Sequence, residues 1–183
     1  MVSTNAQTCK REEVERRILR PFFEFRTLES PLVLDALDGT ETIANAGKIF
    51  EASIHSGFKD SKLNKASVAT PETVVTLYEL HEGATLAQMF GYLGRDLQEL
   101  CLTQAQVINF CKKHTQWIGG LTFFLFKDEK GELCVAEASV YGYSGLMAYL
   151  HDFNYRYRWQ GHPNEWDKSR IVVPGMKSIQ ELS

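Results

Sequence analysis

Two cysteines and a histidine in the second half of the chain are of types that could carry out nucleophilic chemistry. A thiol attacks at neutral pH only when a base takes its proton or its pKa is lowered, so Cys111 or Cys134 would need His151 beside it. Asp152 or Asn154 could then orient the imidazole. No local signature supports this pairing, and cysteines in apolar stretches are usually small core residues. We therefore expect both thiols to pack in the core.

The same region offers a few residues of metal-ligating type. Cys111 and His114 are three residues apart on a predicted helix, where they would share a face, and His151 and His162 are available elsewhere. A structural zinc ion normally takes four ligands, typically from two close pairs, and one close pair is visible. The sequence therefore predicts no metal site, and we expect no cofactor.

The sequence also lacks the motifs of the best-known enzyme classes. It contains no phosphate-binding glycine loop, dinucleotide fingerprint, nucleophile elbow or HExxH motif.

An alternating run of aromatic and arginine residues gives the strongest two-residue period in the chain. Tyr155, Tyr157 and Trp159 alternate with Arg156 and Arg158. Such residues could stack on bases and bind phosphate, but on a strand the rings and the arginines would lie on opposite faces. The simplest interpretation places the rings in the core and the arginines in water. If the run is functional, it favours a protein-binding face, because these residue types are enriched at hot spots.

A polar segment from Gln160 to Ser169 follows this run. His162 with Glu165 or Asp167 could form a general acid–base pair, although nothing identifies a substrate. Loops of this kind carry function more often than cores do. We interpret the segment as a solvated connection and add His162 and Trp166 to the candidate binding residues.

Helical patterns dominate the first half of the sequence. A proline ends the first helix at Pro21, because proline loses a hydrogen bond and clashes inside a helix. Gly57 stands where a left-handed C-terminal cap is expected, and Thr103 with Gln106 forms a capping box. The predicted helices are Lys10–Arg20, Pro31–Leu37, Thr40–Ile54, Gly83–Gly94 and Thr103–His114.

Strand patterns dominate the second half. Two apolar runs flank a polar turn at 127–131, which predicts an antiparallel hairpin whose first strand is central, since it is apolar on both faces. The segment Phe22–Leu28 is a short strand or an extended anchor. The other predicted strands are Thr73–Leu80, Leu121–Phe126, Leu133–Val140, Phe153–Trp159 and Ile171–Val173. These patterns predict an α+β fold in which a helical N-terminal half packs on a C-terminal antiparallel β-sheet.

Length and composition indicate one domain. The 183 residues are 44% hydrophobic and 23% charged, as in ordinary globular proteins. We expect a tail at 1–9, a single globular domain at 10–174 that is helix-rich to 118 and strand-rich from 121, and a second tail at 175–183.

Charge and cysteine content bear on partners and location. The net charge of -3 makes nucleic acid an unlikely partner, and no run of about 18 apolar residues predicts a membrane span. The four cysteines lack tight spacing and no export signal precedes them, which favours free thiols. We expect a cytoplasmic protein with no membrane contact.

The C-terminal half resembles the conserved part of an uncharacterised family of small bacterial proteins. The matching segments are QAQVINFCKKHTQWI, FFLFKDEKGELCVAEASVYGYSGL, FNYRYRW and RIVVP, between residues 104 and 174. The resemblance lies in the hydrophobic and aromatic pattern. It implies a helix followed by a sheet and transfers no catalytic or binding residue.

Two functions remain open at this stage. The favoured one is a non-enzymatic protein-binding or adaptor domain. Its sheet would present tyrosine, tryptophan and arginine to a protein partner, or to a second copy in a homodimer. This hypothesis predicts an exposed aromatic patch. The alternative is a small hydrolase or transferase, which predicts a cleft where Cys111 or Cys134 approaches His151 or His162.

Overall fold

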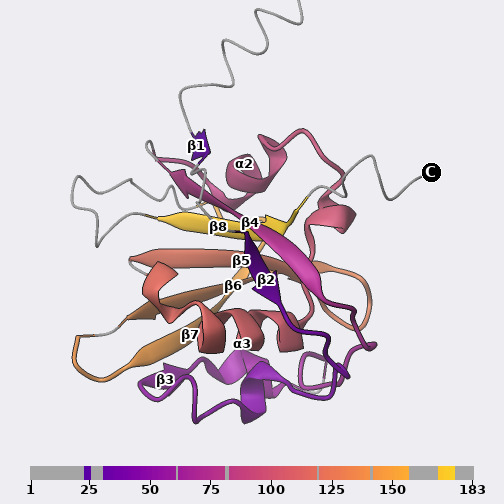
Figure 1. Cartoon of the computed structure of the whole chain (residues 1–183), viewed down its shortest axis with the longest axis vertical. Helices are drawn as coiled ribbons and strands as arrows, with labels where there is room; N and C mark the ends of the chain where they lie inside the picture. Colours follow the sequence, from indigo (N-terminus) through magenta and orange to yellow (C-terminus); the bar gives the residue numbers. More distant parts are fainter. Residues whose placement is uncertain are drawn as a thin grey trace, which may run out of the picture.

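The fold is built around one mixed sheet of eight strands (Figure 1). The computed structural model describes residues 23–25, 31–60, 62–80, 83–118, 120–140, 142–156 and 169–175, with backbone alone for 23–25. The strands are β1 Phe23–Phe25, β2 Leu32–Leu34, β3 Ser53–Ile54, β4 Thr73–Leu80, β5 Leu121–Lys127, β6 Leu133–Val140, β7 Leu146–Asp152 and β8 Arg170–Pro174. Their order is β1-β4-β8-β5-β6-β7-β3, and β2 pairs with β4 beside β1.

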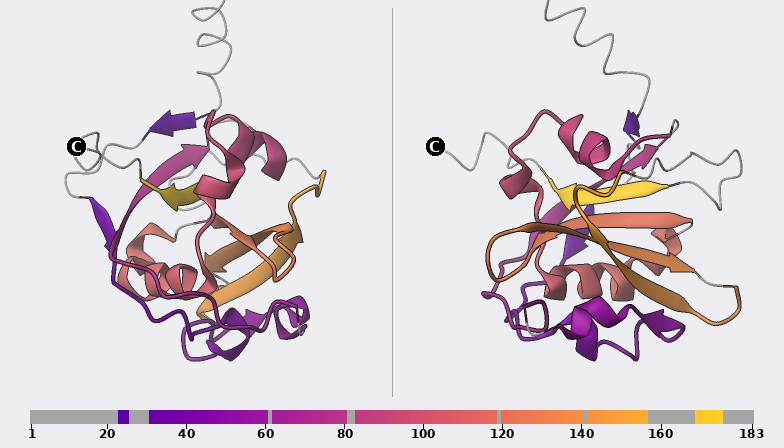
Figure 2. Two further views of the ribbon diagram at one scale, coloured as in Figure 1. Left: turned by 90° about the vertical axis from the view of Figure 1, so that its right-hand side faces the viewer. Right: turned by 180° about the vertical axis from the view of Figure 1, so that it is seen from behind.

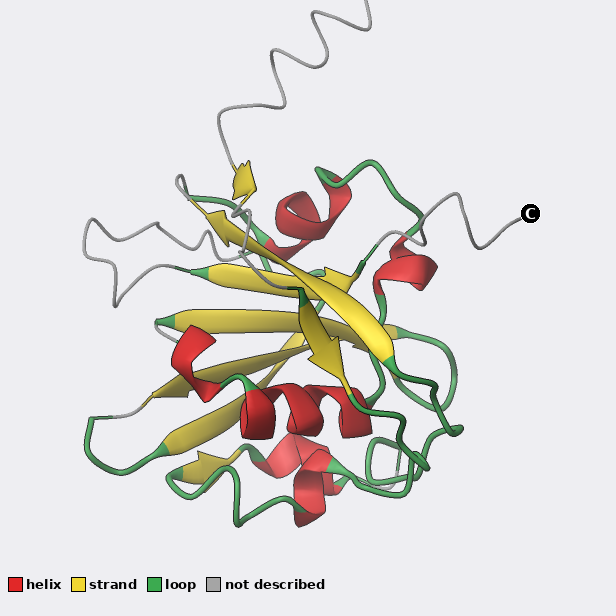
Figure 3. Ribbon diagram, in the orientation of Figure 1, coloured by secondary structure: helices red, strands yellow, loops and turns green. Residues whose placement is uncertain are grey.

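Helices are few in the described part of the chain (Figure 3). Two α-helices are present, α2 Leu86–Gly91 and α3 Gln104–Lys113. Four short 3-10 helices accompany them: η1 Ile43–Asn45, η2 Ser56–Lys59, η3 Leu97–Leu100 and η4 Thr115–Trp117. None of the described helices is long and apolar enough to cross a membrane.

The predicted division into a helical first half and an antiparallel second half is wrong. Strands β1 to β4 all come from the first half and join the same sheet as the later strands. The sheet is mixed, because β3 runs parallel to β7 and β5 runs parallel to β8. Long-range pairing with β4 and β7, which a local pattern does not report, decides the conformation of the early segments.

Two of the predicted helices are not formed. Pro31–Leu37 contains the strand β2, in which Leu32 and Leu34 face the core and pair with β4. In Thr40–Ile54, helix is limited to η1, and β3 follows. Thr42, Asn45 and Gly47 lie in and around η1, and residues of these types favour caps and turns over helix.

Gly57 lies within η2 and is not a helix C-cap. A Cβ at this position would lie 2.7 Å from the Cδ2 atom of Leu150 and 3.1 Å from Nδ1 of His55. The glycine is therefore explained by the close approach of η2 to β7 rather than by a left-handed backbone.

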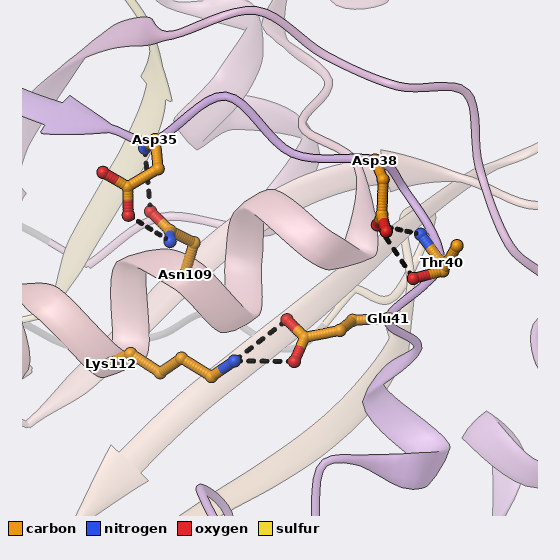
Figure 4. A network of polar contacts seen from close by, with 6 residues as sticks. All are labelled: Asp35, Asp38, Thr40, Glu41, Asn109 and Lys112. Carbon is orange, nitrogen blue, oxygen red and sulfur yellow. Dashed lines mark hydrogen bonds and ion pairs between the residues drawn. The ribbon is translucent and has the colours of Figure 1, made fainter.

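The segment between β2 and η1 is fastened to α3 by polar contacts (Figure 4). The backbone N–H of Asp35 donates to Asn109 Oδ1 at 3.1 Å, and Asn109 Nδ2 donates to the Asp35 carboxylate at 2.9 Å. Lys112 pairs with Glu41 at 2.7 Å. Lys113 donates to Asp35 at 2.6 Å and holds the pKa of this carboxyl below its ordinary value, with a smaller contribution from Asn109.

Several predicted elements are confirmed. Thr73–Leu80 is β4, and a strand is present at Phe23–Phe25 within the predicted segment. Helix α2 begins after Thr85, and α3 begins after Thr103 with the predicted capping box. The antiparallel hairpin is β5–β6, and the last apolar segment is β8. The helix predicted at Lys10–Arg20 lies outside the described residues.

Alternation along the strands divides the hydrophobic core into two parts, one on each face of the sheet. The ribbon views of Figure 2 show α2 and α3 on different sides of the sheet. Phe124 and Phe126 of β5 pack with α3 in one part, which we call the α3-side core. Phe123 and Leu125 pack with Phe90 of α2 in the other, the α2-side core. Strand β5 is therefore apolar on both faces and lies inside the sheet, as its sequence predicts.

Candidate functional site

Three polar side chains are buried together on strands β6 and β7. The Nε2 atom of His151 lies 2.7 Å from Oε2 of Glu137, and the hydroxyl of Ser139 donates to Oε1 of the same carboxylate at 3.1 Å. Each of the three residues is less than 9% exposed. Buried ionisable groups are costly unless they are paired, and this cluster satisfies both oxygens of Glu137.

Strand register explains why these residues meet. Val135 is the Cα partner of His151, and Glu137 is the partner of Tyr149. Glu137 and His151 are therefore diagonal neighbours on one face of the sheet. This is the face of the α2-side core, since Val135 belongs to that core and the ring of Phe123 meets the imidazole edge-on at 6.2 Å between centroids.

A row of four rings runs across the same face. The ring centroids of His55 and Tyr149 are 4.3 Å apart, those of Tyr149 and His151 are 4.8 Å apart, and those of His151 and Tyr155 are 5.9 Å apart. Tyr149 is 40% exposed and Tyr155 is 49% exposed. We call these four residues the histidine–tyrosine row. Its middle histidine is buried against Glu137, whereas its tyrosines reach the surface.

The cluster can orient or exchange a proton but does not form a serine triad. When Nε2 of His151 carries the proton and donates it to Glu137, Nδ1 is the basic atom of the ring. Ser139 donates to the carboxylate and makes no hydrogen bond with the imidazole. A serine nucleophile needs its own base, and Glu137 is already bonded to His151.

Cys111 and Cys134 both lie on the α3 side of the sheet, away from the imidazole of His151. Cys111 belongs to the α3-side core and is 1% exposed, as predicted, and burial raises the pKa of its thiol. The sheet separates it from His151. Cys134 pairs with Asp152 in register, so its side chain leaves the strand on the face opposite to that of His151.

Cys134 and His151 both line a groove of about 750 Å³ at the ends of β6 and β7, which residues 132–134 and 150–154 form. The thiol of Cys134 is only partly buried, so the prediction that it packs in the core is wrong. Burial, followed by the nearby carboxylates of Asp128, Asp152 and Glu132, raises the pKa of Cys134 to about 11. A thiol with this pKa is almost entirely protonated at neutral pH and is a poor nucleophile.

The candidate metal-ligand pair, Cys111 and His114, is occupied by other contacts. Cys111 packs in the α3-side core, and Nε2 of His114 lies 3.2 Å from the carbonyl oxygen of Val33. Within the described residues, no group of three or more histidine, cysteine, aspartate or glutamate side chains could hold a metal ion.

The strand predicted at Phe153–Trp159 is not formed in its described part, residues 153–156. The chain turns after Asp152, where its carbonyl accepts from the N–H of Tyr155 at 2.9 Å and its side chain accepts from the N–H of Asn154 at 2.7 Å. Tyr155 and Arg156 follow this turn, and both are exposed. The remaining candidates lie outside the described residues: Tyr157, Arg158, Trp159, His162 and Trp166.

Four residues of the buried cluster and the histidine–tyrosine row are absent from the sequence-based candidates: His55, Glu137, Ser139 and Tyr149. One of them carried a usable signal, because Glu137 is the sole carboxylate in the apolar strand β6, LCVAEASV. A charged residue in a strand of this kind is rarely buried without a partner. The hairpin register could have indicated His151 as that partner.

Comparisons of this chain with protein-family models, with curated proteins and with solved structures find no match.

Proposed function

We propose that this chain is a binding protein and that the histidine–tyrosine row contacts a protein partner. The observation that carries the proposal is the pair of half-exposed tyrosines, Tyr149 and Tyr155, whose rings lie tilted against a histidine that a buried carboxylate holds in place. Tyrosine combines a large apolar ring with a polar hydroxyl and is enriched at binding hot spots.

Rigidity supports this use of the row. His151 is fixed by Glu137, Tyr149 lies on a paired strand, and His55 accepts a hydrogen bond from the N–H of Gly57 at 3.3 Å. Side chains that are ordered before binding lose little conformational entropy in the complex. The sequence-based preference for a protein-binding domain is retained, but the surface proposed for it is centred on β7.

An enzyme that uses His151 as an acid–base group is the second candidate. The 2.7 Å contact with Glu137 favours it, because a carboxylate that orients an imidazole is a common arrangement in acid–base catalysis. The thiol versions of the enzyme hypothesis have less support, since burial raises the pKa values of Cys111 and Cys134.

Site-specific crosslinking tests the binding function. Met147 lies on the same face of β7 as Tyr149, two residues away, so a photoreactive benzoylphenylalanine at position 147 would sample the surface beside the intact row. The matched control places the same amino acid at Val68, which is 77% exposed elsewhere on the molecule. Illumination is carried out in the source cells and with the purified chain alone.

We expect one discrete protein adduct from position 147, none from position 68, and loss of the adduct in the Tyr149→Ala/Tyr155→Ala variant. Thermal unfolding would verify that the variant is folded. An adduct with the purified chain alone would identify a homodimer as the complex. The proposal is wrong if position 147 gives no adduct, or if the adduct persists in the double variant.

A further inference from the structure

A second concave site shares no residue with the histidine–tyrosine row and contains lysines. It is a cavity of about 550 Å³, within the range of small-molecule sites. Three segments form it: the loop at 62–68, the connection from η3 into α3 at 98–104, and the start of the β5–β6 turn at 127–129. We call it the lysine cavity.

Hydrogen bonds between the three segments fix the walls of the lysine cavity. The side chain of Gln104 donates to the carbonyl oxygen of Leu63 at 2.5 Å and accepts from the N–H of Ile43 at 3.0 Å. The N–H of Glu129 donates to the carbonyl oxygen of Lys62 at 3.4 Å. Lys65 forms an ion pair with Glu129 across the cavity mouth. The cavity therefore joins segments that are distant in sequence and mutually anchored.

The charges around the cavity leave an excess of cations. Three lysines, Lys62, Lys65 and Lys127, face two carboxylates, Asp128 and Glu129. Glu129 is engaged by Lys65, and one oxygen of Asp128 already accepts the N–H groups of residues 130 and 132. Among the described residues, neither Lys62 nor Lys127 forms an ion pair. This local excess contrasts with the chain's net charge of -3.

The other wall residues are apolar or weakly polar. Leu63 and Leu102 are buried in the α3-side core, Val68 is exposed at the rim, and the thiol of Cys101 is partly buried. Burial raises the pKa of Cys101 to about 11, and the positive charge of Lys127 opposes this rise. Lys127 and Cys101 both line the cavity, so a cationic side chain and apolar wall residues belong to one site.

We propose that the lysine cavity binds a small organic anion, a phosphate or carboxylate group carried on an apolar body about the size of one ring. Lys62 and Lys127 would hold the anionic group by charge-assisted hydrogen bonds. The positive end of α3 would add to their field. The apolar body would lie against Leu63, Leu102 and Val68.

Thiol protection measures binding directly, because Cys101 lines the cavity. The folded chain is alkylated with iodoacetamide, and the modification of each cysteine is followed by mass spectrometry. The probes are phenyl phosphate, benzoate, inorganic phosphate and the neutral benzyl alcohol. Cys134, which has a similarly raised pKa of about 11 but lies in a different groove, is the internal control.

We expect phenyl phosphate or benzoate to slow alkylation of Cys101 and leave Cys134 unchanged, while benzyl alcohol has no effect. The more protective of the two anions would distinguish phosphate from carboxylate. Inorganic phosphate should protect less, because it lacks the apolar body.

Lysine variants separate a specific site from general attraction of anions. Lys62→Met and Lys127→Met keep the aliphatic stem, and each should weaken binding of the protective anion by about tenfold in calorimetric titration. Lys130→Met is the matched control, since Lys130 belongs to the same turn as Lys127 but does not line the cavity. Calorimetry is needed because Lys127→Met also changes the reactivity of Cys101. No anion-dependent protection, or equal weakening by all three variants, would overturn the proposal.

Discussion

Glu137 is the residue on which the candidate site depends, because its carboxylate contacts both His151 and Ser139. A double-mutant cycle measures the first of these contacts. With Glu137→Gln and His151→Phe, we expect a coupling energy of about 1–3 kcal/mol from urea denaturation, since a buried hydrogen bond to a charged group is being removed. The pair Glu137→Gln and Lys112→Met should be additive within about 0.5 kcal/mol, because Lys112 is remote. Equal coupling in both cycles would contradict the direct contact.

Predictions about single residues were correct where the apolar sequence around a residue was enough to predict its burial. Cys111 lies in an apolar helix face and is buried, as expected. These predictions missed the site, because the partners considered for His151 do not include Glu137 or Ser139. Strand alternation also places Cys134, one of the thiols considered beside His151, on the opposite face. The contact between the rings of His55 and Tyr149 also depends on the parallel pairing of β3 with β7, which joins segments about ninety residues apart. No local pattern encodes that contact.

At the scale of elements, α3 is the best-predicted part of the chain. The hydroxyl of Thr103 accepts from the N–H of Gln106 at 3.2 Å, and the Gln106 side chain accepts from the N–H of Thr103 at 2.9 Å. We expect Thr103→Ala to lower the free energy of unfolding by about 1 kcal/mol, the usual value for a lost cap. Thr103→Ser keeps the hydroxyl and should restore most of it. Equal losses in the alanine and serine variants would mean that the cap contributes nothing.

Elements were predictable when one local signal dominated. The capping box at Thr103 marks the start of α3, and β-branched and aromatic residues mark β4. Between Pro31 and Ile54 the signals conflicted. Apolar spacing favours helix there. In the structure, Leu32 and Leu34 pair with β4, and Asp35 is hydrogen-bonded to α3. These long-range contacts outweigh the local helix propensity.

At the scale of the whole molecule, β8 joins the two parts of the sheet. It lies between β4 and β5, pairing antiparallel with the first and parallel with the second. Ile171 and Val173 enter the α2-side core, and Val172 enters the α3-side core. The apolar pattern predicted a last strand, but its central position follows from pairing with a strand about a hundred residues earlier.

Removal of β8 should therefore unfold the whole domain, whereas removal of an edge strand would leave the rest of the sheet paired. A chain that ends at Ser169 would leave β4 and β5 without their shared neighbour and would expose both cores. We expect it to lose the cooperative urea transition, because unpaired backbone and exposed apolar surface are both costly. A synthetic peptide spanning 169–175, added in trans, should restore the transition. A truncated chain that unfolds cooperatively at the full-length midpoint without the peptide would show that β8 is peripheral to the stability of the sheet.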